Sequence, residues 1–187
     1  MKLKFVYSHV LDQLFTDMSL QKYNYNQLTE VSKFIENLNL EWKKYGGKII
    51  KEIEKISGLK FKYDKLHCFV VKNMFYDAIS YPFIIKISKN KYILDILIHE
   101  LIHVILKDDK KLITVLNKFV LVEDSKVHLP VLLIQNKVTE NIFDKKRFDK
   151  FLDGEASNSL CELWGQIKKD YSDFDKDILG YLKNASR

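Results

Sequence analysis

One segment constrains the fold more than any other: the apolar stretch from Tyr92 to Leu106, which is interrupted by Asp95, His99, Glu100 and His103. It is too short and too polar to span a bilayer, because a transmembrane helix needs about 20 predominantly apolar residues. Burying several ionisable groups in an apolar helix is costly unless they have partners. The segment therefore predicts a buried helix whose polar side chains are paired or bind a ligand.

The spacing of these polar residues is typical of a metal site. His99 and His103 are four residues apart, so on a helix they project from one face about one turn apart. Both imidazoles can then reach one zinc ion at roughly 2.0–2.1 Å. Glu100 follows the first histidine and is placed to accept a proton from a zinc-bound water that attacks a carbonyl. The competing interpretation is a hydrogen-bonded core network without metal.

The motif His99-Glu100-Leu101-Ile102-His103, with its apolar surroundings, resembles the signature of the zincin metallopeptidases, which is HExxH on a buried helix. The chain is also similar to small, soluble zincin-like proteins of prokaryotes and their viruses. The resemblance implies a zinc cofactor and a general-base role for Glu100. It further implies an edge strand that aligns a peptide beside the motif helix, matched here to Ile79–Ile87.

The third zinc ligand is open, because catalytic zinc has three protein ligands and one free position. His128 is the preferred candidate. Imidazole is a favoured zinc ligand, and Pro130 restricts the backbone just after it. With His128 the site would consist of three histidines, His99, His103 and His128.

Glu140 is the second candidate for the third ligand. Thermolysin-like zincins use a glutamate on a later helix and an aspartate four residues on that orients a histidine, and Glu140 and Asp144 have this spacing. Thr139 departs from that pattern, which has asparagine before the glutamate. Asp144 and Asp95 are the candidate hydrogen-bond acceptors for the second nitrogen of a ligating histidine.

Asp109 and Glu155 are weaker candidates. Asp109 stands where the metzincin pattern has a ligand, but Leu106 replaces the glycine that this pattern needs for its turn. Two upstream histidines, His9 and His67, are interpreted as structural. The sequence identifies no residue that would stabilise an oxyanion.

The remaining pattern predicts one α+β domain over residues 1–187. Helical periodicity runs from Asn26 to Ile56, with a break expected at Gly46-Gly47 and a C-cap at Gly58. Pro82 implies that the Ile79–Ile87 strand is an edge strand or starts after the proline. The expected architecture is zincin-like: N-terminal helices, a small mixed or antiparallel sheet, a buried HExxH helix, and a helical C-terminal part beginning at Pro130. The expected strands are Lys2–Tyr7, His67–Val71 and Ile79–Ile87.

Net charge and cysteine content indicate the kind of surface and the cellular compartment to expect. The 31 basic and 25 acidic residues leave a net charge of +6 and are spread along the chain. This favours an ordinary solvated surface over a nucleic-acid interface. Cys68 and Cys161 form no CxxC pair, which is typical of a reducing compartment. The N-terminus lacks the pattern of a signal peptide, so a cytoplasmic protein without a membrane segment is expected.

These observations favour a zinc metallopeptidase that acts on a peptide or protein. The alternative is a binding or regulatory module that keeps the scaffold without turnover. Glu100 favours the enzyme, because a scaffold alone does not require a carboxylate beside the ligand. A third hypothesis, an enzyme directed to nucleic-acid-bound proteins, depends only on the net charge of +6. The oligomeric state is not indicated.

Overall fold

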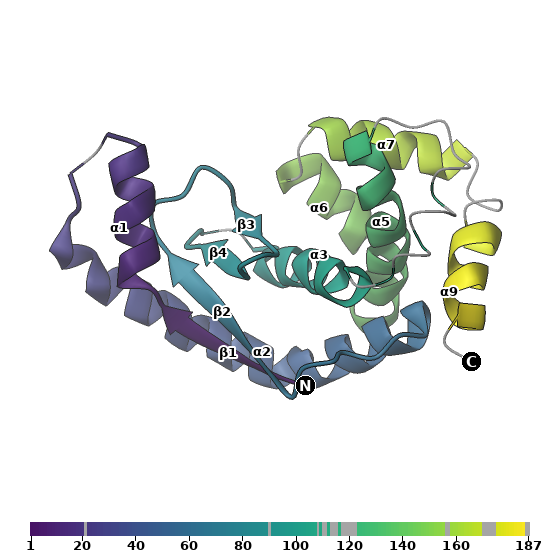
Figure 1. Cartoon of the computed structure of the whole chain (residues 1–187), viewed down its shortest axis with the longest axis horizontal. Helices are drawn as coiled ribbons and strands as arrows, with labels where there is room; N and C mark the ends of the chain where they lie inside the picture. The colour runs from purple at the N-terminus through teal and green to yellow at the C-terminus, as the bar shows by residue number, and fades with distance from the viewer. Residues whose placement is uncertain are drawn as a thin grey trace.

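Strands and helices both contribute to the core, so the expected α+β class is confirmed (Figure 1). The computed structural model describes residues 1–20, 22–89, 91–107, 109, 112, 116, 123–155, 158–169 and 175–185. The strands are β1 (Lys2–Tyr7), β2 (Lys65–Val71), β3 (Ala78–Ile79) and β4 (Ile84–Lys86). The helical elements are α1 (His9–Met18), η1 (Tyr25–Gln27), α2 (Leu28–Ser57), α3 (Ile93–Leu106), α5 (Glu123–Ile142), α6 (Arg147–Glu155), α7 (Asn158–Lys169), η2 (Asp175–Leu179) and α9 (Gly180–Ala185).

The four strands form one mixed sheet in the order β1-β2-β4-β3. β1, β2 and β4 are parallel, and β3 is antiparallel to β4. The strands expected at Lys2–Tyr7 and His67–Val71 are confirmed, because their alternating side chains place Phe5 and Cys68 in the core and leave Lys4 in solvent.

The third expected strand is divided at Pro82. β4 starts after the proline, as one of the two sequence interpretations predicts, because proline has no N–H for the strand ladder. β4 nevertheless lies between β2 and β3, so it is not the edge of the sheet. The edge beside β4 is the short strand β3. Any extended peptide that pairs with this side of the sheet would therefore meet β3. The expectation that the Ile79–Ile87 strand forms the edge is thus wrong for its main part, β4.

The expected break at Gly46-Gly47 is also wrong, since α2 continues for 30 residues through both glycines. It ends at Gly58, which adopts the left-handed conformation (φ 74°) expected of a C-cap. Gly46 lies against the ring of Trp42, and a Cβ atom there would be only 2.3 Å from the Cε2 atom of Trp42. The glycine makes room for an aromatic ring and does not end a helix.

Two neighbouring glycines in α2 should therefore respond oppositely to alanine. Gly46→Ala is expected to lower the free energy of unfolding by about 1–3 kcal/mol, because the added methyl group overpacks the Trp42 ring. Gly47→Ala is expected to raise the free energy of unfolding by about 0.5–1 kcal/mol. The added Cβ would meet no packed neighbour within 4 Å, and alanine is the better helix former. Urea denaturation of both variants measures the difference, and equal effects would contradict this packing role.

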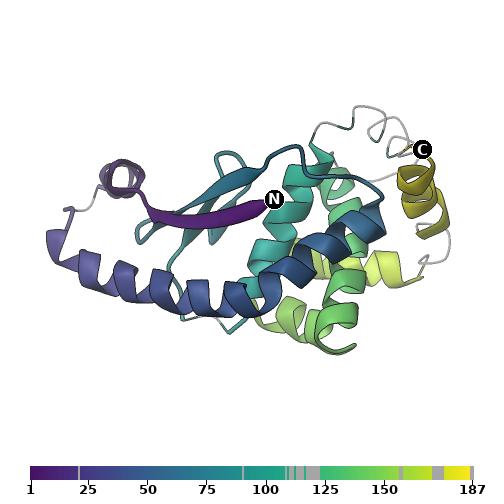
Figure 2. The same ribbon diagram turned by 90° about the horizontal axis from the view of Figure 1, so that it is seen from below.

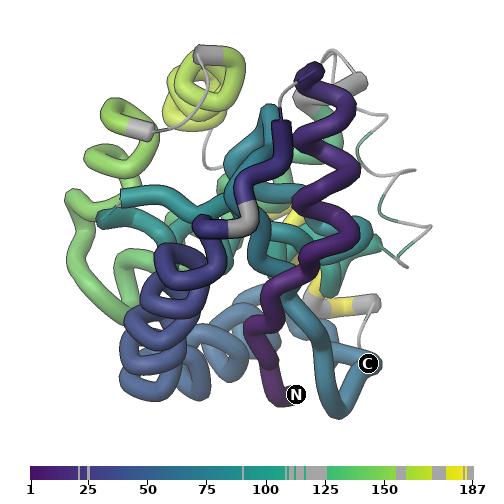
Figure 3. The backbone as a smooth tube through the Cα atoms, turned by 90° about the vertical axis from the view of Figure 1, so that its left-hand side faces the viewer, coloured from purple at the N-terminus to yellow at the C-terminus, as the bar shows by residue number. Residues whose placement is uncertain are grey.

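The sheet lies between two helices of different size. Figures 2 and 3 show α1 and α2 on opposite sides of it. The long helix α2 covers the face that carries Phe5, Cys68 and Val70, and α3 joins the same core. The short helix α1 covers the end of the other face, where Leu11 and Phe15 pack beside Val71, Met74 and Ile84. Helix α3 therefore packs on the same face of the sheet as α2.

The C-terminal helices complete the surroundings of α3. Figure 1 shows α5 packed beside α3, with α6, α7 and α9 on the outside. The expectation that Pro130 stands in the first turn of its helix is wrong: α5 begins at Glu123 and contains Pro130 in its interior. His128 therefore lies within a helix rather than at its entry. None of the helices in the described ranges is both long and apolar enough to cross a membrane.

Candidate metal centre

Helix α3 holds the motif residues in the middle of the core. Leu97, Ile98, Leu101 and Ile102 are fully buried on the faces that contact the sheet, α2 and α5. The helix ends at Leu106. Its i, i+4 spacing places the two motif histidines on one side of this buried helix.

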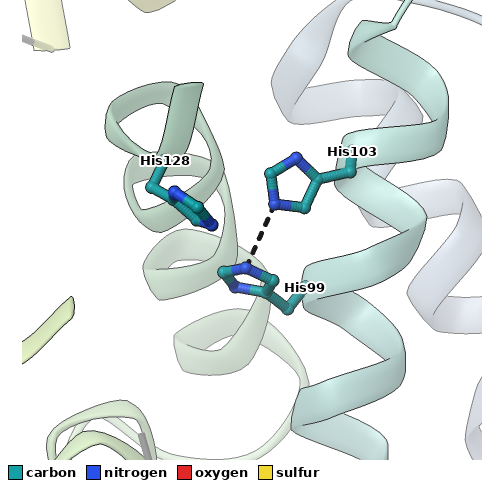
Figure 4. Close-up of side chains that lie close together, drawn as sticks. All are labelled: His99, His103 and His128. Atoms are coloured by element: carbon teal, nitrogen blue, oxygen red, sulfur yellow. Dashed lines mark hydrogen bonds between the residues drawn. The ribbon is translucent and has the colours of Figure 1, made fainter. Parts of the chain in front are cut away.

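Three histidines from two helices meet at this side of α3. His99 and His103 project from α3, and His128 projects toward them from α5 (Figure 4). One ring nitrogen of each lies within 4.8 Å of those of the other two. The ring centroid of His128 is 5.5 Å from that of His99 and 5.0 Å from that of His103. The tertiary fold therefore brings together the three residues that the sequence analysis selects.

The donor set fits a metal ion. The Nε2 atoms of His99 and His103 are 3.2 Å apart. Two nitrogens bound at about 2.0–2.1 Å to one tetrahedral ion are separated by about 3.3–3.4 Å. Burial lowers the pKa of His99 to about 4 and that of His103 to about 3. Both imidazoles are therefore neutral at pH 7, which is the form that binds metals.

A hydrogen-bond chain determines the tautomer of His99. The backbone carbonyl of Asp95 accepts a bond of 3.0 Å from Nε2 of Gln135. This orients the amide so that its oxygen faces His99, and Nδ1 of His99 donates to it over 2.9 Å. Because Nδ1 carries the proton, Nε2 of His99 has a free lone pair directed toward His103. The chain holds His99 in the tautomer that a metal ligand needs.

The sequence analysis did not identify Gln135 and assigned its role to Asp95 or Asp144. The buried carboxylate of Asp95 instead binds Arg147, with a shortest N–O distance of 2.8 Å. Asp144 is exposed and accepts a hydrogen bond from the backbone of Lys146. Gln135 follows His128 by seven residues, about two helical turns, and so lies on the same face of α5. That spacing is the signal in the sequence that points to Gln135.

We expect Gln135→Ala to weaken metal binding by about 10–100-fold, the usual effect of removing a residue that orients a ligand. Its physical cause is the loss of the acceptor that fixes the His99 ring and tautomer. Competition with a chromophoric chelator measures the affinity. Asn136→Ala, one position further along α5, is the matched control and should leave the affinity unchanged. Equal affinities of Gln135→Ala and the wild-type protein would refute the orienting role.

Glu100 lies on the side of α3 that faces the β3–β4 turn. The hydroxyl of Ser80 in this turn donates a hydrogen bond to Oε2 of Glu100. Burial raises the pKa of Glu100, and the bond from Ser80 opposes this increase. A carboxylate with a raised pKa is a better proton acceptor. Ser80 has no signal in the sequence, because its proximity to Glu100 depends on how β3 meets α3.

The other described candidates for a third ligand are not part of the three-histidine group. Glu140 forms a salt bridge of 3.4 Å with Lys145 near the surface. Oδ1 of Asp109 accepts hydrogen bonds from the backbone N–H of Leu112 and the hydroxyl of Tyr181. The side chain of Glu155 lies outside the described part of the structure. His9 and His67 are exposed on α1 and β2 and do not belong to the three-histidine group.

A cavity of about 290 Å³ opens beside His103. His103 forms part of its wall, and the hydroxyl-bearing residues Ser80 and Tyr81 form another part. The remaining wall is largely apolar, with Leu106, Leu112, Leu116, Val127 and Pro130, and it also includes the charged residues Lys107 and Asp109. A molecule in this cavity would contact both His103 and the serine that binds Glu100.

The fold and site define an α+β protein with a three-histidine group, capable of holding a metal ion, between two adjacent helices. Comparison with protein-family models, with curated proteins and with solved structures yields no match. The functional argument therefore depends on the residues of this chain.

Proposed function

We propose that the protein is a zinc-dependent metallopeptidase of the zincin type. The observation that carries this proposal is the meeting of His99 and His103 of α3 with His128 of α5, whose ligand atoms lie within 4.8 Å of one another, while α3 also carries Glu100. Neutral imidazoles on a rigid, buried scaffold are suited to zinc. A purely structural cluster would not require the adjacent carboxylate.

When bound, zinc lowers the pKa of a water ligand to about 7 and polarises a carbonyl oxygen. Glu100 accepts the proton of the attacking water at its carboxylate and later donates it to the departing amine. Ser80 holds one oxygen of Glu100 and so restricts the orientation of the carboxylate. Gln135 keeps the proton of His99 on Nδ1, away from the metal side.

The surroundings of the site support a peptide substrate with an apolar side chain. The cavity beside His103 has an apolar wall and enough volume for one large side chain. The short edge strand β3 leads into Ser80, which also lines this cavity. An extended peptide paired with β3 would lead into the cavity that Ser80 and His103 line.

Peptide hydrolysis can be tested without a known substrate. Zinc-loaded protein is incubated with a complex mixture of peptides, and new termini are identified by mass spectrometry. We expect cleavage next to large apolar residues, and its loss after zinc is removed with a chelator and its return after zinc is added back. Stoichiometric zinc binding without any cleavage would instead favour a binding module that keeps the scaffold without turnover.

Comparison of two variants tests the third ligand. We expect His128→Ala to weaken zinc binding by more than about 100-fold, which exceeds the 10–100-fold typical of a residue that only orients a ligand. Glu140→Ala should have little effect, since its carboxylate lies near Lys145. Asp144→Ala is a further control. Strong zinc binding by His128→Ala, with losses in both other variants, would favour the thermolysin-like arrangement.

A further inference from the structure

The pairing of β1 with β2 gathers basic side chains that are far apart in the sequence. In the parallel register, Lys2 lies beside Lys65, and Lys4 lies beside His67. All four side chains are exposed, whereas the alternate residues Phe5 and Cys68 are buried on the opposite face. We call these four residues, Lys2, Lys4, Lys65 and His67, the β1–β2 basic face.

This face is not neutralised by the protein itself. Within the described residues, Lys2, Lys4 and Lys65 take part in none of the salt bridges. Like charges directly opposite each other on neighbouring strands are destabilising. Lysines on β1 protect an edge strand from aggregation. That explanation does not extend to Lys65 and His67, because β2 is an internal strand.

One exposed ring, the imidazole of His67, accompanies the lysines. The imidazole of His67 lies nearly parallel to the ring of Phe69, with an interplanar angle of 21° and a centroid distance of 6.5 Å. The basic face therefore offers both cations and the flat ring of His67. An acidic peptide would use only the cations, whereas nucleobases also stack on rings.

We propose that the β1–β2 basic face binds single-stranded nucleic acid, with Lys2, Lys4 and Lys65 contacting phosphates and His67 stacking on a base. Single-strand binding by a cationic surface with aromatic rings is independent of sequence and depends strongly on salt. The formal net charge of +6 adds to the attraction of a polyanion. This proposal is independent of the metal centre, whose histidines lie on α3 and α5.

The test uses the full chain and a fluorescent oligothymidine, with oligouridine and oligoglutamate as parallel probes. Three lysine–phosphate contacts predict that affinity for the single strand falls roughly 15–20-fold between about 50 and 200 mM salt. Anisotropy titrations at both salt concentrations measure this slope. The two nucleic acids distinguish DNA from RNA as the partner, and oligoglutamate should bind at least about tenfold more weakly than the better of them.

Matched variants localise the binding. Lys2→Glu/Lys65→Glu should lower the affinity at low salt at least about tenfold, because it removes two phosphate contacts and adds repulsion. Lys48→Glu/Lys51→Glu, which makes the same change of charge on exposed residues of α2, should change it less than about threefold. His67→Ala should weaken binding about fivefold or more without changing the salt slope.

Three results would overturn the proposal: no binding at low salt, equal losses in both charge-reversal variants, or oligoglutamate binding as tight as that of the nucleic acids. The substituted side chains are on the surface, and a thermal melt confirms the fold of each variant. Lys2→Gln/Lys65→Gln, which removes the positive charges without adding negative ones, repeats the test if charge reversal impairs folding. Zinc content should be unchanged in every variant, which separates this site from the metal centre.

Discussion

Replacing either motif histidine with alanine is expected to abolish metal binding. The wild-type protein should hold about one zinc ion per chain, as a tetrahedral site with three protein ligands does. His99→Ala or His103→Ala leaves two ligands. Among the described residues, no further histidine, cysteine, aspartate or glutamate belongs to this group. We expect the affinity to fall by well over 100-fold, more than the loss typical of a residue that only orients a ligand.

Metal analysis after dialysis measures this loss. His9→Ala is the matched control, because His9 is an exposed histidine on α1 outside the cluster. Both site variants should keep the far-ultraviolet circular dichroism of the wild type, since removing a metal ligand spares the core around Leu97 and Leu101. Wild-type zinc content in either folded variant would end the metal-site hypothesis.

Glu100→Gln is expected to leave zinc bound while lowering peptide hydrolysis by about 10²–10⁴-fold. The amide keeps the shape of the side chain but cannot accept the proton of the attacking water. It can still accept the hydrogen bond from Ser80, so the local structure should persist. The largest effect should appear in kcat, since the carboxylate acts in the chemical step.

The matched control for this experiment is Glu140→Gln, which makes the same chemical change at a carboxylate that lies near Lys145. It should leave both zinc content and hydrolysis unchanged. Full activity of Glu100→Gln would assign the general base to another residue. Loss of zinc together with loss of activity would show instead that Glu100 supports the metal site itself.

Patterns within single elements could be read from the sequence. The strand expected at Lys2–Tyr7 is present, and the apolar segment around His99 and His103 forms the expected buried helix. The errors fell where packing overrides local preference. Gly46 signals a break, but the Trp42 ring fills the space beside it and the helix continues. Pro130 signals a first turn, but α5 extends to Glu123 on its N-terminal side.

The residues of the candidate site fall into two groups: those that the sequence relates to one another and those that only tertiary packing brings together. His99, Glu100 and His103 belong to one helical turn, so the sequence alone relates their positions. His128 was selected from residue chemistry and the nearby Pro130, and its role as a ligand stays a prediction. Gln135 and Ser80 were not selected, because their contacts with His99 and Glu100 join segments 36 and 20 residues apart. Such contacts depend on how whole elements pack.

The sequence by itself determined an α+β chain with an i, i+4 histidine pair and a carboxylate on a buried helix. These features depend on the periods of the helix and the strand, which act over a few residues. Only the tertiary structure brought α5 against α3, so that His128 and Gln135 reach His99, and only it placed Lys2 beside Lys65. The physical reason is that each element is placed by the burial of its apolar face. The hydrophobic effect that drives this burial is non-directional, so an element's own sequence does not specify which elements become its neighbours.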